Sequence, residues 1–555
     1  MLSLRSATVA ALAVAAMTVT GPRPAAAQMT RGDTAYDLVI RGGRVLDGAG
    51  NPWIRADVAI SNGRFVKIGF IPEHGRVELD AHGKYVSPGW IDVMDQSGRE
   101  LQRDGLAESK LMQGVTSAIA GEGGTPVSAT DIPKFFQQLE TQGISLNFGT
   151  YFSEAQTRAE VVGLTSRAAT APELARMRMI MDTAMRAGAM GMTSALIYPP
   201  SSYATTAELI EVGKSAAQYG GIYASHIRGE GKEVVQSVKE AIAIGAGAGM
   251  PVEIFHLKVA YRPGWGILMD SVRDVIDAAR ARGEDVAADM YVYTAGGTNL
   301  AATIPTWAHN GGTDSLKARL ANPAVRARLK REQKTGSPGW WNLVEASGGW
   351  DGVVLSEAHD PDFEKYDGQS IAQIAKETGN DPADVVFDLV EHGGGRVSAL
   401  YYMMSEQDIE TALKFPWTSI GSDAAAVTPV AGVPPAPGLT HPRDYGNPVR
   451  VIAWYVKQRH VLTLQDAIRK MTSWPATRYR LANRGIIKEG DWADVTIFDL
   501  DSLKDVATYQ HPTEYPTGID WVLVNGVVTI DHGKHTGAKA GKILYGPGRV
   551  APGKH

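Results

Sequence analysis

The chain has 555 residues, of which 44% are hydrophobic, 21% charged and 8% aromatic. This balance is typical of a folded globular protein, and the length predicts one large domain with at least one smaller one. It excludes a short peptide or a disulfide-stabilised miniprotein. The formal charge is −5, and the basic residues form no run that would follow a phosphate backbone, so we expect no nucleic-acid partner.

Residues 1–27 have the three-part composition of a secretory signal. Arg5 comes first, the apolar stretch Ala7–Val19 follows, and three alanines precede Gln28. We expect cleavage near Ala27 and a soluble mature protein exported to a bacterial periplasm, with no stable membrane insertion. The alternative is an uncleaved anchor, for which the apolar stretch is short. Cysteine is absent, so any metal ion needs nitrogen and oxygen ligands.

The two ends of the chain share one pattern. Residues 28–86 and 485–555 are rich in β-branched residues and are interrupted by turn pairs such as Asn-Gly and Asp-Gly. This pattern predicts short antiparallel strands and hairpins. We therefore expect both ends to build one small β domain together.

Between them, residues 87–484 alternate apolar strands with amphipathic helical stretches. The eight candidate strands are Trp90–Gln96, Ser117–Glu122, Leu146–Phe152, Gly191–Tyr198, Ile222–Ile227, Val252–Lys258, Val286–Tyr293 and Thr418–Asp423. The alternation predicts an α/β fold of the (β/α)8 TIM-like barrel type, with reactive groups at the carboxyl ends of the strands. Residues 298–414 are too long for an ordinary connection, so we expect an insertion near the barrel mouth, before the last strand.

Four polar residues stand at the ends of otherwise apolar strands, namely Glu122, His226, His256 and Asp423. A lone histidine at such a position is more often a hydrogen-bonded core residue than a ligand. Together, however, two imidazoles and one carboxylate form a known ligand set of catalytic zinc sites. Asp423 would then be free to take a proton from the attacking water.

A collinear series of motifs extends over nearly the whole mature chain: DLVIRGGRVLDGAG, SPGWID, QGVTSAIAGEGG, YASHIRGEG, IFHLK, SIGSD, HPRDYG, KEGDWADVTIFD and HTGAKAGK. The series resembles the amidohydrolase superfamily and, within it, the N-acyl-D-amino-acid deacylase (D-aminoacylase) group. The resemblance implies a metal-dependent amide hydrolase acting on small molecules. It also implies a (β/α)8 catalytic domain and a small β-sandwich made from both ends.

Two features of the family pattern are missing. The frame PGxIDxHxH has Met94 and Gln96 in place of its histidines, and these side chains are poor ligands for a divalent ion. The family's bridging cysteine corresponds to Gly123, with Glu122 one residue earlier. We infer that the more exposed family metal position is lost and that one zinc ion remains. A regular strand would turn Glu122 to the opposite face, so its role depends on the local backbone.

The resemblance also implies cationic and phenolic groups that bind the substrate carboxylate. The corresponding positions are Lys258, Tyr291, Tyr293 and Arg443, and Tyr198 follows a family pattern near the acyl group. Arg443 suits this role because a guanidinium can bind a carboxylate with two parallel hydrogen bonds. The alternative roles are a salt bridge for Lys258 and ordinary packing for the tyrosines.

Three functional alternatives remain open at this point. The first is another amidohydrolase reaction, such as the opening of a dipeptide, lactam or cyclic imide. The second is a non-catalytic periplasmic binding or scaffold barrel. The third is an enzyme that uses Asp423 and Glu122 as a metal-free carboxylate pair.

Overall fold

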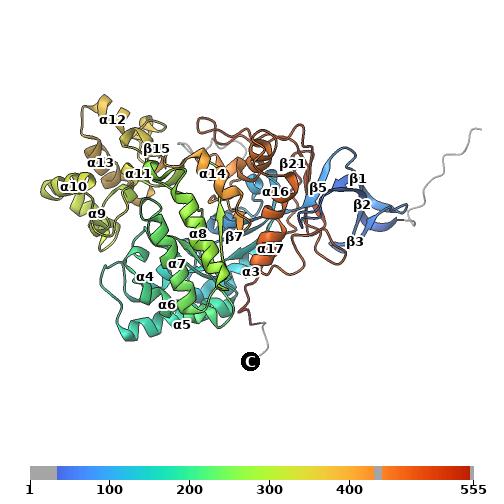
Figure 1. Ribbon diagram of the computed structural model, residues 1–555, viewed down its shortest axis with the longest axis horizontal. Helices are drawn as coiled ribbons and strands as arrows, with labels where there is room; N and C mark the ends of the chain where they lie inside the picture. The colour runs from blue at the N-terminus through green and yellow to red at the C-terminus, as the bar shows by residue number, and fades with distance from the viewer. Residues whose placement is uncertain (1–33, 430–439, 551–555) are drawn as a thin grey trace, which may run out of the picture.

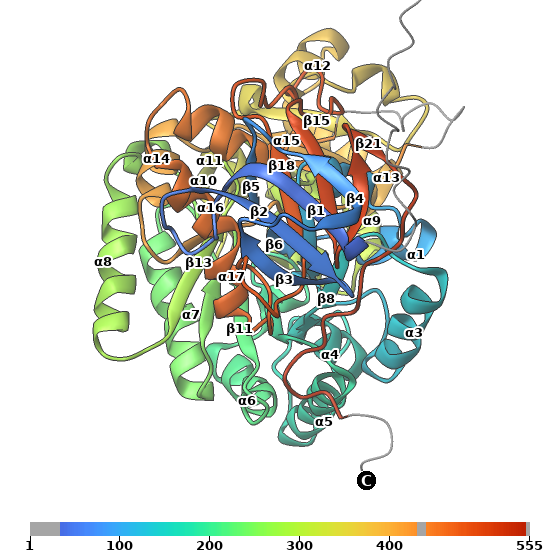
Figure 2. The same ribbon diagram turned by 90° about the vertical axis from the view of Figure 1, so that its right-hand side faces the viewer.

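Strands from both ends of the chain form one nine-stranded sheet in the computed structural model, which describes residues 34–429 and 440–550. Its strands are β1 (Thr34–Val45), β2 (Ile54–Ser61), β3 (Arg64–Gly69), β4 (His74–Asp80), β5 (Tyr85–Pro88), β18 (Val495–Phe498), β19 (Ile519–Val524), β20 (Val527–Asp531) and β21 (Lys534–His535). The two halves join where β5 pairs antiparallel with β18, with Tyr85 opposite Phe498. Figure 2 shows the blue N-terminal strands beside the red C-terminal strands. The proposed signal segment 1–27 lies outside the described residues.

Eight parallel strand positions form the barrel. They are β6 (Trp90–Asp95), β7 (Val115–Ala120), β8 with its continuation β9 (Asn147–Thr150 and Phe152–Ser153), β10 (Gly191–Ala195), β11 (Ile222–His226), β12 (Val252–Ile254), β13 (Val286–Met290) and β17 (Thr418–Ile420). A parallel bridge between Asp95 and Ala424 closes β6 against the end of β17. All eight predicted strands are present. Most end earlier than predicted, because their last residues leave the ladder and form the loops at the barrel mouth.

Helices cover the outside of the barrel (Figure 1). They are α1 (Gly98–Arg103), α2 (Glu108–Met112), α3 (Ile132–Gln142), α4 (Glu154–Val161), α5 (Ala171–Ala187), α6 (Thr206–Ala217), α7 (Val234–Ala248), α8 (Leu268–Ala281), α14 (Glu406–Leu413), α15 (Arg443–Arg450), α16 (Leu464–Met471) and α17 (Ser473–Arg478). In α8, Met269, Val272, Ile276 and Ala279 recur at helical spacing and are buried. None of the helices in the described ranges has the length and apolarity needed to cross a bilayer.

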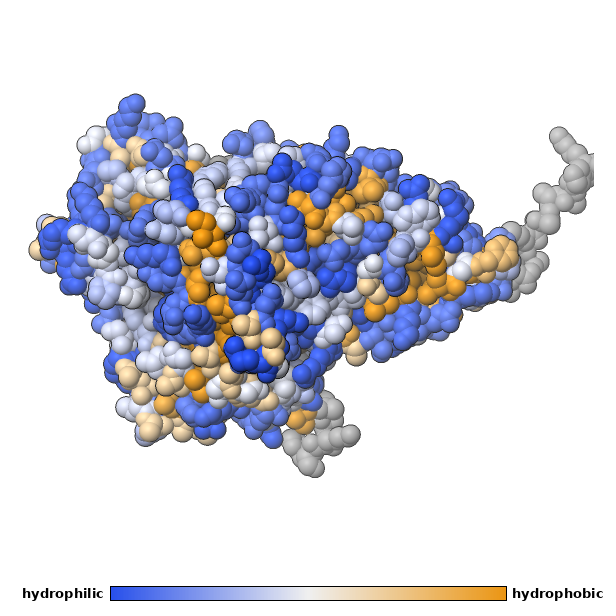
Figure 3. Space-filling model, in the orientation of Figure 1, coloured by the Kyte–Doolittle hydropathy of each residue, from blue (hydrophilic) through white to orange (hydrophobic). Residues whose placement is uncertain are grey.

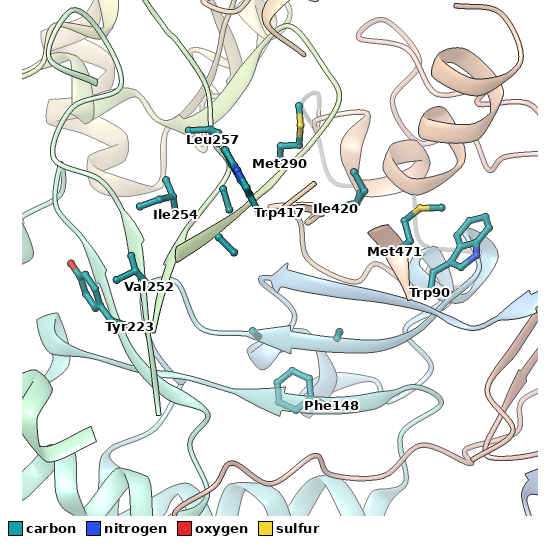
Figure 4. Packing of buried hydrophobic residues seen from close by; sticks show 14 of the residues in the cluster. Trp90, Phe148, Tyr223, Val252, Ile254, Leu257, Met290, Trp417, Ile420 and Met471 are labelled. Carbon is teal, nitrogen blue, oxygen red and sulfur yellow. The ribbon is translucent and has the colours of Figure 1, made fainter. Parts of the chain in front are cut away.

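The core lies between the barrel strands and these helices. Figure 4 shows residues of this core, with Val252 of β12 beside Tyr223 of β11, and Met290 of β13 near Leu257 and Trp417. On the face seen in Figure 3, apolar residues form separate bands among polar ones. The buried apolar layer therefore holds the strand ends at fixed positions, and the site is built on those ends.

The segment between β13 and β17 forms a lobe with its own core. It contains β14 (Gly296–Asn299), β15 (Val353–Glu357), β16 (Ser398–Tyr401), α9 (Thr313–Leu320), α10 (Pro323–Thr335), α11 (Leu343–Ala346), α12 (Ile371–Thr378) and α13 (Pro382–Gly393). β14 and β15 both pair antiparallel with β16. In Figure 1 this lobe lies at the opposite end of the barrel from the β-sandwich.

Candidate active site

A cavity of about 300 Å³ lies at the carboxyl ends of the barrel strands. Its barrel wall comes from the ends of several strands, and its outer wall includes Trp341, Leu343 and Tyr401 of the lobe. The lining contains all four of the predicted strand-end residues: Glu122, His226, His256 and Asp423. The fold therefore places residues that are distant in sequence around one cavity.

Glu122 reaches this cavity because the chain turns just after β7. The strand ends at Ala120, and Gly121 has a φ of +114°, a conformation that glycine adopts without a Cβ clash. The turn removes the side-to-side alternation that would have directed Glu122 outward. Oε1 of Glu122 lies 2.8 Å from Nδ1 of His226 and 3.2 Å from Nε2 of His256.

The two histidines come from neighbouring strands. His226 is the last residue of β11, and His256 stands in the turn after β12 with a φ of +36°, where its backbone N–H donates to Asp289 at 2.9 Å. Glu230 lies behind them. Its Oε1 accepts a hydrogen bond from Lys258 Nζ at 2.6 Å and lies 3.0 Å from Nδ1 of His256. Glu230 therefore engages the far nitrogen of this ring and leaves Nε2 directed at Glu122.

Two carboxylates and two imidazoles set the electrostatics of this group. Burial alone would raise the pKa of Glu122, but hydrogen bonds from both imidazoles outweigh it and hold the pKa well below its ordinary value. Burial and Lys258 lower the pKa of His256, yet Glu230 and Glu122 together raise it to about 9. Glu122 and Glu230 thus stabilise positive charge on the His256 ring, and a metal ion bound there would replace that proton.

Asp423 approaches from the other side, after β17. Its φ is +52°, and its backbone N–H donates to the Met94 carbonyl at 2.8 Å. Oδ2 lies 2.7 Å from Nη1 of Arg443, and Oδ1 accepts a hydrogen bond from Nε2 of Gln96 at 3.2 Å. Unlike Glu122, the Asp423 carboxylate makes no contact with the histidines among the described residues.

Glu122, His226 and His256 fit a divalent ion. Their ligand atoms all lie within 4.8 Å of one another, and the set of one carboxylate and two imidazoles is a zinc ligand set. Atoms bound to a tetrahedral ion at about 2.1 Å lie roughly 3.4 Å apart, close to the observed spacing. Nε2 of His226 is buried and has no hydrogen-bond partner within the described chain.

Comparisons with known proteins agree with this geometry. The profile of the amidohydrolase family matches residues 77–530, most of the chain. The chain belongs to the amidohydrolase family. It is 31% identical to the D-aminoacylase of Alcaligenes xylosoxydans xylosoxydans over 533 residues, 92% of this chain and 97% of that protein.

Two solved structures place this amidohydrolase close to the D-aminoacylases. One is a D-aminoacylase with a binuclear metal centre, described as having one-metal activation and second-metal attenuation (TM-score 0.76, 28% identity, covering 92% of this chain and 100% of that one). The other is the N-acyl-D-glutamate deacylase of Bordetella bronchiseptica with zinc and a phosphonate inhibitor (TM-score 0.76, 28% identity, covering 92% and 99%). The chain is thus a metal-dependent amidohydrolase related to the N-acyl-D-amino-acid deacylases.

This amidohydrolase places the two replaced histidine positions in different surroundings. Met94 is buried in the barrel interior with Ile119 and Phe255. Gln96, in contrast, lines the cavity, and its Nε2 donates to Oε2 of Glu122 at 2.8 Å as well as to Asp423. The sequence shows only that Gln96 replaces a histidine ligand of the family. It does not show the hydrogen bonds of Gln96, because they join residues that are far apart along the chain.

The predicted substrate residues divide into two groups. Lys258, Tyr291, Arg443 and Tyr198 line the cavity. Tyr293 does not, because its hydroxyl is directed at two other acceptors, the Pro442 carbonyl oxygen at 3.3 Å and Asp505 Oδ1 at 3.4 Å. Strand alternation does not separate the two tyrosines, since both follow the end of β13 at Met290.

Proposed function

We propose that this amidohydrolase deacylates N-acyl amino acids, D-isomers in particular, or related amides that bear a free carboxylate. One observation carries the proposal: the same 300 Å³ cavity contains the Glu122, His226 and His256 group, the Asp423 carboxylate and the buried Arg443 guanidinium. We assign one zinc ion to the first group. When bound, such an ion supplies an acidified water and polarises a carbonyl oxygen.

Asp423 has the position of a general base. Its carboxylate lies in the cavity, apart from the His226 and His256 pair. Each oxygen contacts one described group, Arg443 or Gln96, so acceptor sites remain for a proton. In the proposed reaction it accepts a proton as water attacks the amide carbon. It then returns that proton to the departing amine, which leaves as a neutral group.

Arg443 is the strongest candidate for the substrate carboxylate. It is buried, and its Nη1 is paired with Asp423 at 2.7 Å, but its Nε has no hydrogen-bond partner in the described part of the chain. Its guanidinium lies 4.6 Å from the centre of the Tyr291 ring, which holds it in place. The Lys258 ammonium donates to Glu230, the carboxylate that contacts His256. We therefore assign Lys258 two roles: it holds Glu230 against His256, and it adds a positive charge to the pocket wall.

The acyl group then faces the wall formed by Tyr198 and the lobe. The Tyr198 hydroxyl shares a hydrogen bond of 2.7 Å with Thr298, and its ring centre lies 5.3 Å from that of His226. This contact places an aromatic surface beside the reacting group. The lobe residues Trp341 and Leu343 complete the wall.

A substrate panel tests the proposal. Purified protein with measured zinc content is assayed on N-acetyl-D-amino acids, N-acetyl-L-amino acids and the matching N-acetyl amines that lack a carboxylate. We expect the carboxylate-bearing D-series to be preferred, and Arg443→Met to lower its kcat/KM by about 10- to 100-fold, the loss of one charged hydrogen bond. Faster turnover of the neutral amines, or full activity of Arg443→Met on the carboxylate series, would contradict the assignment.

A further inference from the structure

One amide nitrogen connects the two carboxylates of the site. Nε2 of Gln96 donates to Oε2 of Glu122 at 2.8 Å and to Oδ1 of Asp423 at 3.2 Å. A primary amide has two N–H groups, so both contacts can be made at once. Gln96 thereby joins the proposed metal ligand to the proposed base through a single group.

The two oxygens of Glu122 have different partners. Oε1 faces His226 and His256, whereas Oε2 is held by Gln96. Ligand carboxylates depend on such outer hydrogen bonds for their orientation, and losing one weakens metal affinity. Removing the Gln96 amide would free Glu122 to rotate away from the histidines.

The same reasoning applies to Asp423. Its Oδ2 contacts Arg443, the group that we assign to the substrate carboxylate. Arg443 would be shared between Asp423 and the substrate carboxylate, so the hydrogen bond from Gln96 is the described side-chain contact of Asp423 that substrate does not share. Gln96 is therefore placed to hold the base while the reaction proceeds.

The backbone keeps Gln96 in this position. Its N–H donates to the Ala424 carbonyl at 3.1 Å, and the Asp423 N–H donates to Met94 at 2.8 Å. Below them, buried Lys110 binds Asp92 at 2.8 Å and the Ala424 carbonyl at 2.8 Å. The end of β6 and the loop after β17 are thus fixed against each other.

We propose that Gln96 is a positioning residue that orients Glu122 and Asp423 together and keeps a second cation out of the space between them. An amide nitrogen presents hydrogens to both carboxylates and has no lone pair for a metal ion. A second ion that bridged these carboxylates would have to displace it. This inference rests on the proposed function for the role of Asp423, but its metal-binding part does not need a substrate.

Two variants test it. Gln96→Ala removes both donors, and Gln96→Glu puts an oxygen in place of the nitrogen. Zinc affinity is measured by competition with a chromophoric chelator, zinc content by elemental analysis, and kcat and KM on the preferred amide. Gln102→Ala is the matched control, because the Gln102 amide lies outside the cavity and donates an exposed hydrogen bond of 3.3 Å to Gln138.

We expect Gln96→Ala to bind zinc about 10- to 100-fold more weakly and to lose at least about 10-fold in kcat, with KM changed less than about 3-fold. Gln96→Glu should take up a second zinc ion when zinc is in excess. With zinc in excess, both variants should remain folded, and Gln96→Ala should unfold at nearly the same temperature as the wild type. The control should match the wild type in every measurement.

The proposal is overturned if folded Gln96→Ala keeps wild-type zinc affinity, or if Gln96→Glu still binds a single ion in excess zinc. A failure of the proposed function looks different. In that case the wild type would not hydrolyse N-acyl amino acids, whereas the loss of zinc affinity in Gln96→Ala would still support the role of Gln96 towards Glu122.

Discussion

Three residues of the site leave their strands through backbone conformations with positive φ. Gly121, His256 and Asp423 have φ values of +114°, +36° and +52°. For a non-glycine residue such a conformation costs on the order of 1–3 kcal/mol and persists where the surroundings enforce it. Here the enforcing contacts are hydrogen bonds from backbone N–H groups: that of His256 donates to the Asp289 carboxylate and that of Asp423 to the Met94 carbonyl. These three turns let the side chains of Glu122, His256 and Asp423, which follow different strands, converge on one cavity.

At this scale, replacing Asp423 tests the chemistry directly. Asp423→Asn keeps the size of the side chain but cannot accept a proton, so kcat should fall by about 100- to 10,000-fold. Zinc content should not change, because Asp423 is outside the Glu122, His226 and His256 group. Kinetics and elemental analysis of the same sample check both parts. The exposed Asp501→Asn serves as control, and unchanged turnover in Asp423→Asn would refute its role as base.

At the scale of elements, one buried lysine joins three parts of the barrel. Lys110 of α2 lies 2.8 Å from Asp92 and 3.0 Å from Asp95 on β6, and its Nζ donates to Ser422 Oγ after β17 at 2.7 Å. Asp95 is fully buried and points to this lysine instead of the cavity. The cluster sets the relative position of Gln96 and Asp423, which follow these strands.

Lys110→Met would leave two buried carboxylates without their cation. Breaking a buried ion pair in this way costs about 3–5 kcal/mol, so the free energy of unfolding should fall by that order. Urea unfolding measures the loss. Adding Asp92→Asn and Asp95→Asn to the variant should restore part of the stability, because the uncompensated charges are then removed. A Lys110→Met protein as stable as the wild type would show that the cluster contributes little.

At the scale of the molecule, the barrel lies between the β-sandwich and the lobe, and the segment after β21 contacts the barrel as well. After β21 the chain returns to the barrel, where the Phe148 N–H donates to Lys542 at 2.9 Å and the Leu544 N–H donates to Phe148 at 2.7 Å. Gly541 permits this approach, since a Cβ there would lie 1.9 Å from the Leu146 carbonyl oxygen. The C-terminal segment therefore contacts β8 of the barrel as well as following the sandwich.

Buried carboxyl groups make global stability depend on pH. Burial is the main cause that raises the pKa of Glu154 to about 8. The negative charge of Glu208 also raises this pKa, and the positive charge of Arg158 lowers it in part. The unfolded chain loses this proton near its ordinary pKa of 4.5, whereas the folded chain keeps it. The contribution to stability is therefore complete below that pH and is lost as the pH rises towards about 8.

Glu154→Gln should remove this part of the pH dependence. We expect the Tm of the wild type to fall more than that of the variant between about pH 6 and about pH 9, by the equivalent of at least about 1 kcal/mol. Thermal unfolding by circular dichroism measures the difference. Glu160→Gln, an exposed change on the same helix, is the control. If Tm falls equally in the wild type and in Glu154→Gln over this pH range, the Glu154 proton does not contribute to the pH dependence of stability.

The fold could be predicted from local patterns because each element carries its own period. Alternating β-branched residues predict the terminal strands, and strands alternating with amphipathic helices predict the barrel. The apolar face of α8 shows why the prediction works. Apolar residues at helical spacing lie on one side of the helix, and this is the side that packs on the barrel, with Met269 and Ile276 buried. The candidate ligands were visible for the same reason, as polar ends of apolar strands.

By itself, then, the sequence determined the architecture, the family resemblance and the chemical types available to the site, because periodicity and residue chemistry are local properties. Only the tertiary structure decided that Glu122 turns inward after Gly121, that Gln96 joins Glu122 to Asp423, and that Tyr293 faces away from the cavity. These outcomes depend on single backbone dihedral angles and on contacts between residues hundreds of positions apart. No pattern within one segment of chain encodes such contacts.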